Sequence, residues 1–220
     1  ACCFNGSLCA QSDAQIYERT CDAKTYPFSD PSPVATPNNS YYPYFRFDGF
    51  SMQAQEKQWK MVVLENDYVK LTVTPEIGGK IWGAIDKVNN KEFVYTNGVV
   101  KFRDVAMRGP WTSGGIEFNF GIIGHAPTCS TPIDYLTKKN VDGSVSCHIF
   151  SYEWITRTVW NVEINLPKDK AYFTTHTTWF NQSSIDQPYY QWMNAGYATK
   201  TGTRFYYPGT YSLSLIHISE

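Results

Sequence analysis

The chain has 220 residues, of which 42% are hydrophobic, and this is enough for one domain with a full core plus appendages. Its formal net charge of −1 favours neither nucleic acid nor an anionic membrane surface as a partner. No apolar run approaches the roughly 20 residues that span a bilayer. Aromatic side chains make up 16% of the residues, which fits an all-β core or ring-shaped ligands.

Residues 1–20 are typical of the end of an export signal followed by a mature N-terminus. The small residues Ser7, Cys9 and Ala10 indicate a signal-peptidase-like cleavage site near Gln11. Alternatively, Cys2 is the lipid-carrying cysteine of a lipoprotein. Either pattern predicts an exported protein, periplasmic or associated with the outer membrane, and an ordinary cytosolic N-terminus is the third interpretation.

Residues 21–58 carry five prolines among clusters of Asn, Ser and Tyr. Proline lacks a backbone N–H and interrupts both helices and central strands. We therefore predict an extended arm that lies over the domain surface, with its aromatic side chains as anchors. A flexible linker is the alternative.

From residue 59 onward, segments rich in Val, Ile, Thr and aromatic residues alternate apolar and polar side chains, and turn residues separate them. No segment shows a sustained helical period. The sequence predicts an all-β fold, a large antiparallel two-sheet sandwich over residues 59–212. Its strands are expected within 59–66, 67–79, 80–87, 92–96, 131–139, 143–154, 156–167, 170–182 and 188–199.

The most unusual stretch is residues 108–127, RGPWTSGGIEFNFGIIGHAP, with five glycines and two prolines. Because regular helices and strands tolerate few of these residues, we predict a shaped loop that leads into a short strand and out again. Alternation places Ile116, Phe118 and Phe120 on one face of that strand, and Glu117 and Asn119 on the other. His125 follows a glycine-bounded turn that lets it fold back onto the polar face.

Glu117 and His125 are the candidate catalytic residues, as an acid/base pair above a sheet. A salt bridge or loop capping is the structural alternative for Glu117, and backbone hydrogen bonding is the alternative for His125. The candidate substrate-binding residues are a cation, three flat aromatic rings that suit sugar C–H groups, and two amides that suit hydroxyls: Arg108, Trp111, Tyr190, Trp192, Asn119 and Asn194. Bracing of Glu117 by Arg108, core packing of the rings and turn roles for the amides are the alternatives.

Cys129 and Cys147 are the candidate disulfide pair, because an exported chain permits disulfides and both cysteines lie in the predicted folded region. If Asp142 and Gly143 form a two-residue turn, Lys138 lies opposite Cys147, so Cys129 has to arrive from a neighbouring strand. No CxxC or HxxxH spacing is present, so we expect no structural zinc site. We also expect no cofactor.

Residues 213–220, LSLIHISE, match the translation of a transposase-type sequencing adapter. We therefore predict a non-native tail that follows natural sequence ending near residue 211 or 212. The natural protein is then expected to continue beyond this point.

Three long motifs carry a family resemblance: VTPEIGGKIWGAIDKVNNKEFVYTN, MRGPWTSGGIEFNFGIIGHAPT and QPYYQWMNAGYA. The first resembles the opening of galactose-mutarotase-like (aldose epimerase) domains. All three together, over roughly Tyr44 to Tyr211, resemble a largely uncharacterised bacterial subfamily of that superfamily. Its members are usually followed by tetratricopeptide (TPR) repeats and are often encoded among polysaccharide-degrading genes.

The resemblance implies a sandwich that binds a sugar across a concave sheet. In mutarotases, a histidine acts as general acid and a late glutamate as general base at the anomeric carbon. Here the strand expected to carry the catalytic histidine reads Trp192-Met193-Asn194-Ala195, and the late glutamate is absent. The resemblance therefore does not carry mutarotase activity over to this chain.

The expected function is carbohydrate binding or processing in an exported protein, with a mono- or oligosaccharide as partner. Acid/base chemistry at an anomeric centre, as in epimerases or glycoside hydrolases, is the enzymatic form of this expectation. The alternative is a non-catalytic carbohydrate-binding or scaffold module attached to downstream TPR repeats.

Overall fold

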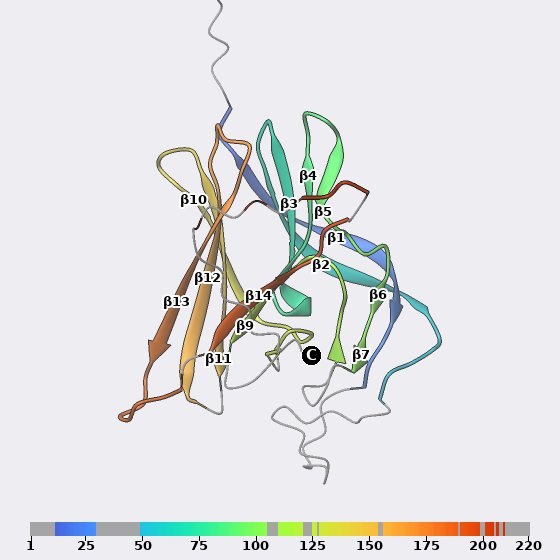
Figure 1. Ribbon diagram of the computed structural model, residues 1–220, viewed down its shortest axis with the longest axis vertical. Coiled ribbons are helices and arrows are strands. Elements are labelled where there is room, and N and C mark those ends of the chain that lie inside the picture. Colours follow the sequence, from blue (N-terminus) through green and yellow to red (C-terminus); the bar gives the residue numbers. More distant parts are fainter. Residues whose placement is uncertain are drawn as a thin grey trace, which may run out of the picture.

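The protein is an all-β sandwich of two main sheets, as the alternation of apolar and polar residues predicted (Figure 1). The computed structural model describes residues 12–29, 49–104, 110–120, 125–126, 128–153, 156–188, 190–198, 201–204, 206 and 209. A 3₁₀ turn, η1 (Pro75–Ile77), is the single helical element in this part of the chain. No helix of the described residues is long and apolar enough to cross a membrane.

The larger sheet has eight strands in the order β14-β9-β4-β3-β2-β1-β6, with β5 paired to β4. All its pairings are antiparallel except the short parallel contact between β1 and β6. Its strands are β1 (Gln15–Tyr26), β2 (Gln55–Glu65), β3 (Val69–Thr74), β4 (Lys80–Asp86), β5 (Lys91–Val94), β6 (Val100–Lys101), β9 (Ile116–Phe120) and β14 (Gln191–Ala195).

The smaller sheet is a four-stranded antiparallel meander in chain order. Its strands are β10 (Asp134–Lys139), β11 (Val145–Glu153), β12 (Thr158–Leu166) and β13 (Thr174–Asn181). A separate two-stranded ribbon pairs β7 (Arg103–Asp104) with β8 (Pro110–Trp111).

The main core lies between the two large sheets. Alternate residues of β2, β3, β4 and β9 meet those of β11 and β12, and every one of the contributing side chains is buried. Phe120 of β9 stacks on Trp160 of β12 with ring centroids 4.5 Å apart, which joins the two layers directly. A second cluster, around Trp59, Trp82 and Phe102, also includes η1. Residues 61–64 of β2 are therefore buried on both faces of the strand.

The predicted boundaries at residues 20/21 and 58/59 fall inside strands. Residues 21–26 and 55–58, predicted to belong to an extended arm, are parts of β1 and β2. These two strands pair over eleven positions, from Gln15↔Glu65 to Thr25↔Gln55. The sheet therefore begins at residue 15, and residues 30–48 of the predicted arm lie outside the described residues.

Two turns show how side chains set strand connections. Asn66 Oδ1 accepts hydrogen bonds from the backbone N–H groups of Tyr68 and Val69, at 2.8 and 2.7 Å, which closes the predicted β2–β3 turn. The β10–β11 turn is longer than the predicted two residues: the backbone N–H of Asn140 donates to Ser144 O at 2.9 Å, and that of Gly143 donates to Asn140 O at 3.1 Å. Thr137, rather than Lys138, therefore lies opposite Cys147.

The predicted disulfide is not formed. Cys129 and Cys147 are both buried thiols. Cys129 Sγ donates to Pro110 O at 3.4 Å, whereas Cys147 lies inside the main core. Burial raises the pKa of the Cys147 thiol to about 12, with a smaller contribution from Glu18.

Candidate functional site

The candidate site is built on β9, which a glycine turn leads into its place between β14 and β4. Gly114 and Gly115 have φ angles of 77° and 68°, and a Cβ on Gly115 would lie 2.3 Å from Ile81 O. Only glycine fits both restrictions. The turn is fixed by backbone hydrogen bonds from Gly115 N to Tyr95 O and from Gly196 N to Gly115 O, each 2.8 Å long.

Alternation along β9 separates the core from the site, as predicted. Ile116, Phe118 and Phe120 belong to the main core. Glu117 and Asn119 therefore lie on the outer face of the larger sheet. In the antiparallel pairing with β14, Asn194 lies opposite Glu117 and Trp192 lies opposite Asn119, so these four side chains share that face.

The side chains of Glu117 and His125 are hydrogen-bonded to each other. His125 Nδ1 lies 2.5 Å from Glu117 Oε1, and Asn119 Nδ2 donates to the same oxygen at 2.8 Å. Asn119 Oδ1 accepts from the backbone N–H of Ala126 at 2.8 Å, which holds the residue next to His125. The predicted fold-back of His125 onto the polar face of β9 is confirmed.

The two members of this pair differ in exposure. The Glu117 side chain is 3% exposed, whereas that of His125 is 16% exposed. His125 also lies between two indole rings, with centroids 5.8 Å away for Trp111 and 4.9 Å away for Trp192. The imidazole is thus the part of the pair that reaches solvent, and the carboxylate orients it from below.

Lys80 of β4 completes the cluster from inside. Its ammonium lies 3.9 Å from Glu117 Oε2 and donates to Thr112 O and Thr112 Oγ1 at 2.5 and 3.1 Å. The same ammonium lies 5.6 Å from the centroid of the Trp111 ring. Burial lowers the pKa of Lys80, while Glu117 and, to a smaller extent, Cys129 act in the opposite direction.

This arrangement suits proton transfer through one imidazole nitrogen. A carboxylate that accepts from Nδ1 fixes the ring orientation and favours the tautomer whose Nε2 carries no proton. In that state Nε2 can take a proton from a bound hydroxyl or accept a hydrogen bond from it. Among the described residues, no group of three or more His, Cys, Asp or Glu side chains is placed to hold a metal ion.

The sequence profile of a family described as "Domain of unknown function (DUF5107)" matches residues 36–218. The chain belongs to this family. The match includes β9, His125 and β14, so the Glu117–His125 cluster lies within the DUF5107 domain. It also includes residues 213–218, which fall within the predicted adapter-derived tail and outside the described residues.

The DUF5107 chain is also similar to a solved structure, that of a TPR-domain containing protein from Parabacteroides distasonis. The two share 26% sequence identity and a TM-score of 0.76, over 84% of this chain and 32% of that protein. The chain therefore spans about a third of the length of the protein that it resembles.

The structure brings most predicted site residues of the DUF5107 domain together. Trp111, Asn119 and Trp192 surround the Glu117–His125 pair, and Asn194 lies beside Glu117 in register. Tyr190 immediately precedes β14 and is 42% exposed, and no contact recorded among the described residues joins it to the pair. Arg108 lies outside the described residues.

Sequence reasoning missed Lys80 and Thr112. Lys80 begins a strand, KIWGAID, in which the first five residues are buried, and the lysine is itself 1% exposed. A lysine at the buried start of such a strand, directly after Gly78-Gly79, is the signal that could have drawn attention to it, since buried lysines need a specific partner. The partner, Glu117, is 37 positions away in the chain.

Proposed function

We propose that this DUF5107 domain binds carbohydrate on the outer face of its larger sheet, around His125. The observation that carries the proposal is the position of the imidazole between the Trp111 and Trp192 indoles, with Glu117 bonded behind it. Indole rings offer flat apolar surfaces for the C–H faces of a sugar ring. Imidazole and amide groups beside them exchange hydrogen bonds with hydroxyls.

If the domain is an enzyme, His125 is the residue that transfers the proton at the anomeric centre. It can accept or donate a proton at Nε2, whereas Glu117 is nearly completely buried and bonded to Nδ1. Glu117 is accordingly a positioning residue, which modifies its expected role as a direct acid or base. Glycoside hydrolysis uses two carboxyl groups on either side of the bond, roughly 5 to 10 Å apart, and the pair of His125 and the buried Glu117 is not such an arrangement.

The galactose-mutarotase-like relationship, export to the periplasm or outer membrane, and a downstream TPR domain are parts of the same proposal. The all-β sandwich fold agrees with the first. The similarity to a TPR-domain containing protein supports the third. It also favours a second candidate function, a non-catalytic module that presents carbohydrate to partners bound elsewhere in a longer protein.

Calorimetric titration against a panel of plant and host oligosaccharides tests the proposal, with product analysis in the same samples. We expect Trp192→Ala to weaken binding by about tenfold or more, since loss of a stacked ring costs roughly 1–3 kcal/mol by analogy with other ring-stacking sites. Tyr172→Ala is the matched control, because Tyr172 is an exposed aromatic residue between β12 and β13 of the other sheet. Equal binding by both variants would contradict the proposed site.

Glu117→Gln separates the enzyme from the module. In an enzyme, loss of the orienting carboxylate lowers kcat while KM and the dissociation constant change little, because the sugar contacts remain. In a module, the same variant binds sugar nearly as well as the unmodified protein and no turnover is seen in either. Absence of binding across the panel would overturn the carbohydrate proposal as a whole.

A further inference from the structure

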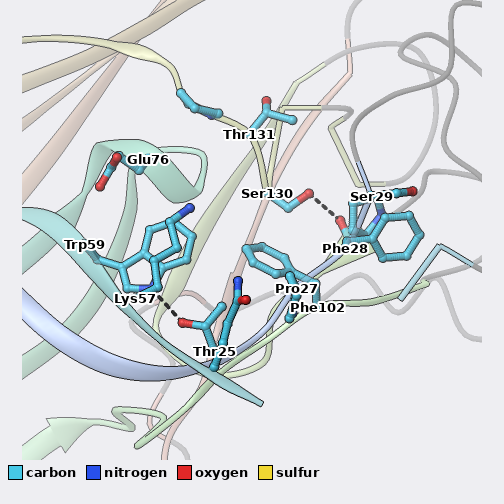
Figure 2. A pocket seen from close by; sticks show the side chains of 13 residues that line it. Thr25, Pro27, Phe28, Ser29, Lys57, Trp59, Glu76, Phe102, Ser130 and Thr131 are labelled. Carbon is cyan, nitrogen blue, oxygen red and sulfur yellow. Dashed lines mark hydrogen bonds between the residues drawn. The ribbon is translucent and has the colours of Figure 1, made fainter. Parts of the chain in front are cut away.

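A cavity lies apart from the Glu117–His125 cluster. It has a volume of about 270 Å³ and is bounded by the end of β1, the start of β2, η1 and residues 130–132 (Figure 2). Pockets that take drug-sized ligands have volumes of roughly 300–1,000 Å³, so this one suits a molecule of about one small ring.

Its walls are fixed by internal hydrogen bonds. Trp59 is buried, and its Nε1 donates to Thr25 Oγ1 at 2.9 Å. Phe102 packs against Trp59 with ring centroids 6.1 Å apart. On the side of residues 130–132, Ser130 Oγ donates to Pro110 O at 2.7 Å. The cavity is therefore formed before any ligand arrives, which lowers the entropy cost of binding.

The charges of the cavity compensate each other. Lys57 Nζ lies over the Trp59 ring, 3.9 Å from its centroid, and is the cation of the lining. Glu76 is the anion, and its Oε2 accepts the backbone N–H of Lys60 at 2.5 Å, which holds the carboxylate in place. Among the described lining residues there is one charge of each sign, which favours a neutral ligand over a charged one.

Ser29 supplies a polar group that lacks a partner. Its Oγ is buried and forms no hydrogen bond within the described part of the chain, and Ser29 is one of the residues that line the cavity. In Figure 2, Ser29 and Phe28 lie on one side of the cavity, and Glu76, Trp59 and Lys57 lie on the other. Buried hydroxyls are nearly always hydrogen-bonded, so an unpaired one on a residue that lines a cavity can bond a ligand once its side chain turns to the rotamer that faces the cavity.

We propose that this cavity is a binding site for a small neutral polyhydroxylated molecule, of the size of one sugar ring. The ligand's hydroxyls bond Ser29 Oγ on one side and the Glu76 carboxylate and Lys57 ammonium on the other. Its apolar face packs on the aromatic and prolyl walls. The polar side chains proposed to bind the ligand here, Ser29, Glu76 and Lys57, are not among those proposed around His125. This site therefore does not depend on the proposed function of His125.

The test is an NMR titration of the ¹⁵N-tryptophan-labelled protein, in which the indole N–H signals report each site separately. Trp59 reports the cavity, and Trp111 and Trp192 report the surroundings of His125. The probes are D-glucose, D-galactose, D-mannose, D-xylose and L-arabinose, with D-glucuronate as the charged comparison. We expect at least one neutral sugar to move the Trp59 signal to saturation, and glucuronate to bind more weakly.

Glu76→Gln is expected to weaken this binding about tenfold, the effect of one charge-assisted hydrogen bond. Glu56→Gln is the matched control, because Glu56 lies on the same strand between the cavity residues Gln55 and Lys57, and its side chain points to the opposite face. Ser29→Ala should also weaken binding without moving the Trp59 signal of the unliganded protein, which shows that the fold is retained.

The two proposals fail separately. His125→Ala should leave the Trp59 titration unchanged while it alters the Trp111 and Trp192 signals. A Trp59 signal that no neutral sugar shifts to saturation would overturn the cavity proposal, whatever happens at His125. So would equal binding by Glu76→Gln and Glu56→Gln, or tighter binding of glucuronate than of every neutral sugar.

Discussion

Lys80 Nζ lies 3.9 Å from Glu117 Oε2, and the two side chains are only 1% and 3% exposed. Isolated charges are rarely buried to this degree, because removing them from water is costly. Lys80 donates hydrogen bonds to the Thr112 oxygens, and Asn119 and His125 bond Glu117 Oε1, whereas Glu117 Oε2 has the Lys80 charge nearby but no hydrogen-bond partner among the described residues. The orientation of His125 therefore depends on a charged pair beneath the surface of the sheet.

The Lys80–Glu117 pair should behave as a coupled unit. Glu117→Gln alone leaves a buried ammonium without its counter-charge, and we expect it to lower the free energy of unfolding by about 3 kcal/mol. Lys80→Met should cost a similar amount, since it leaves the carboxylate unpaired. Urea unfolding of both single variants and the double variant measures the coupling, and the double variant should lose clearly less than the sum. Additive losses would show that the two charges do not interact.

Stability should depend on pH through Lys80. Its pKa in the folded state is lowered from 10.5, so unfolding takes up a proton between the folded pKa and 10.5. This group therefore makes the folded state less stable at the lower end of that interval, and the penalty disappears as the pH rises towards 10.5. The free energy of unfolding of the unmodified protein should therefore rise relative to that of Lys80→Met as the pH increases over that interval. A difference that is constant with pH would contradict the lowered pKa.

Gly115 should be far less tolerant of alanine than Gly98. At Gly115 a Cβ meets Ile81 O at 2.3 Å and φ is +68°, whereas a Cβ on Gly98 finds no atom within 4 Å. We expect Gly115→Ala to lower the unfolding free energy by about 2 kcal/mol or more, because the strained turn also positions β9. Gly98→Ala should change it by less than about 0.5 kcal/mol. Similar thermal unfolding of the two variants would refute the assigned turn.

The thiols should differ in reactivity. Cys21 is partly exposed, whereas Cys129 and Cys147 are buried and the pKa of Cys147 is raised to about 12. Because the thiolate is the reactive form, maleimide should label Cys21 before Cys129 and Cys147 in the folded protein, as read by peptide mass spectrometry. After unfolding without reductant, Cys129 and Cys147 should both be labelled. If Cys129 and Cys147 stay unlabelled after unfolding and become labelled only when a reductant is added, the two form a disulfide.

The alternation of IEFNF was enough to predict which side chains of β9 face the core and which form the site. Nearby side chains and a short turn decide this arrangement, so it can be predicted from the sequence. The strand β1 was missed because its residues QIYERTCDAKTY are mostly exposed, and a strand without a buried face has no period-two signal. Its pairing with β2 depends on a partner some 40 positions away.

The site cation was missed for a related reason. Sequence patterns treat a lysine as a surface residue, and only the fold brings Lys80, Thr112 and Glu117 together. The predicted register opposite Cys147 is wrong because side-chain hydrogen bonds of Asn140 and Asp142 stabilise a turn longer than two residues. The chemistry within β9 was predictable, whereas the contact between Lys80 of β4 and Glu117 of β9 was not.

The central claim is that His125 is the polar group that meets a bound sugar. The most direct measurement is the ¹⁵N NMR spectrum of the imidazole nitrogens, recorded with and without the oligosaccharide that binds most tightly in the calorimetric panel. We predict that the Nε2 signal of His125 shifts on binding, while those of His148 on β11 and His176 on β13, in the other sheet, stay unchanged. An unchanged His125 signal at saturating oligosaccharide would show that the sugar binds elsewhere and would contradict the account.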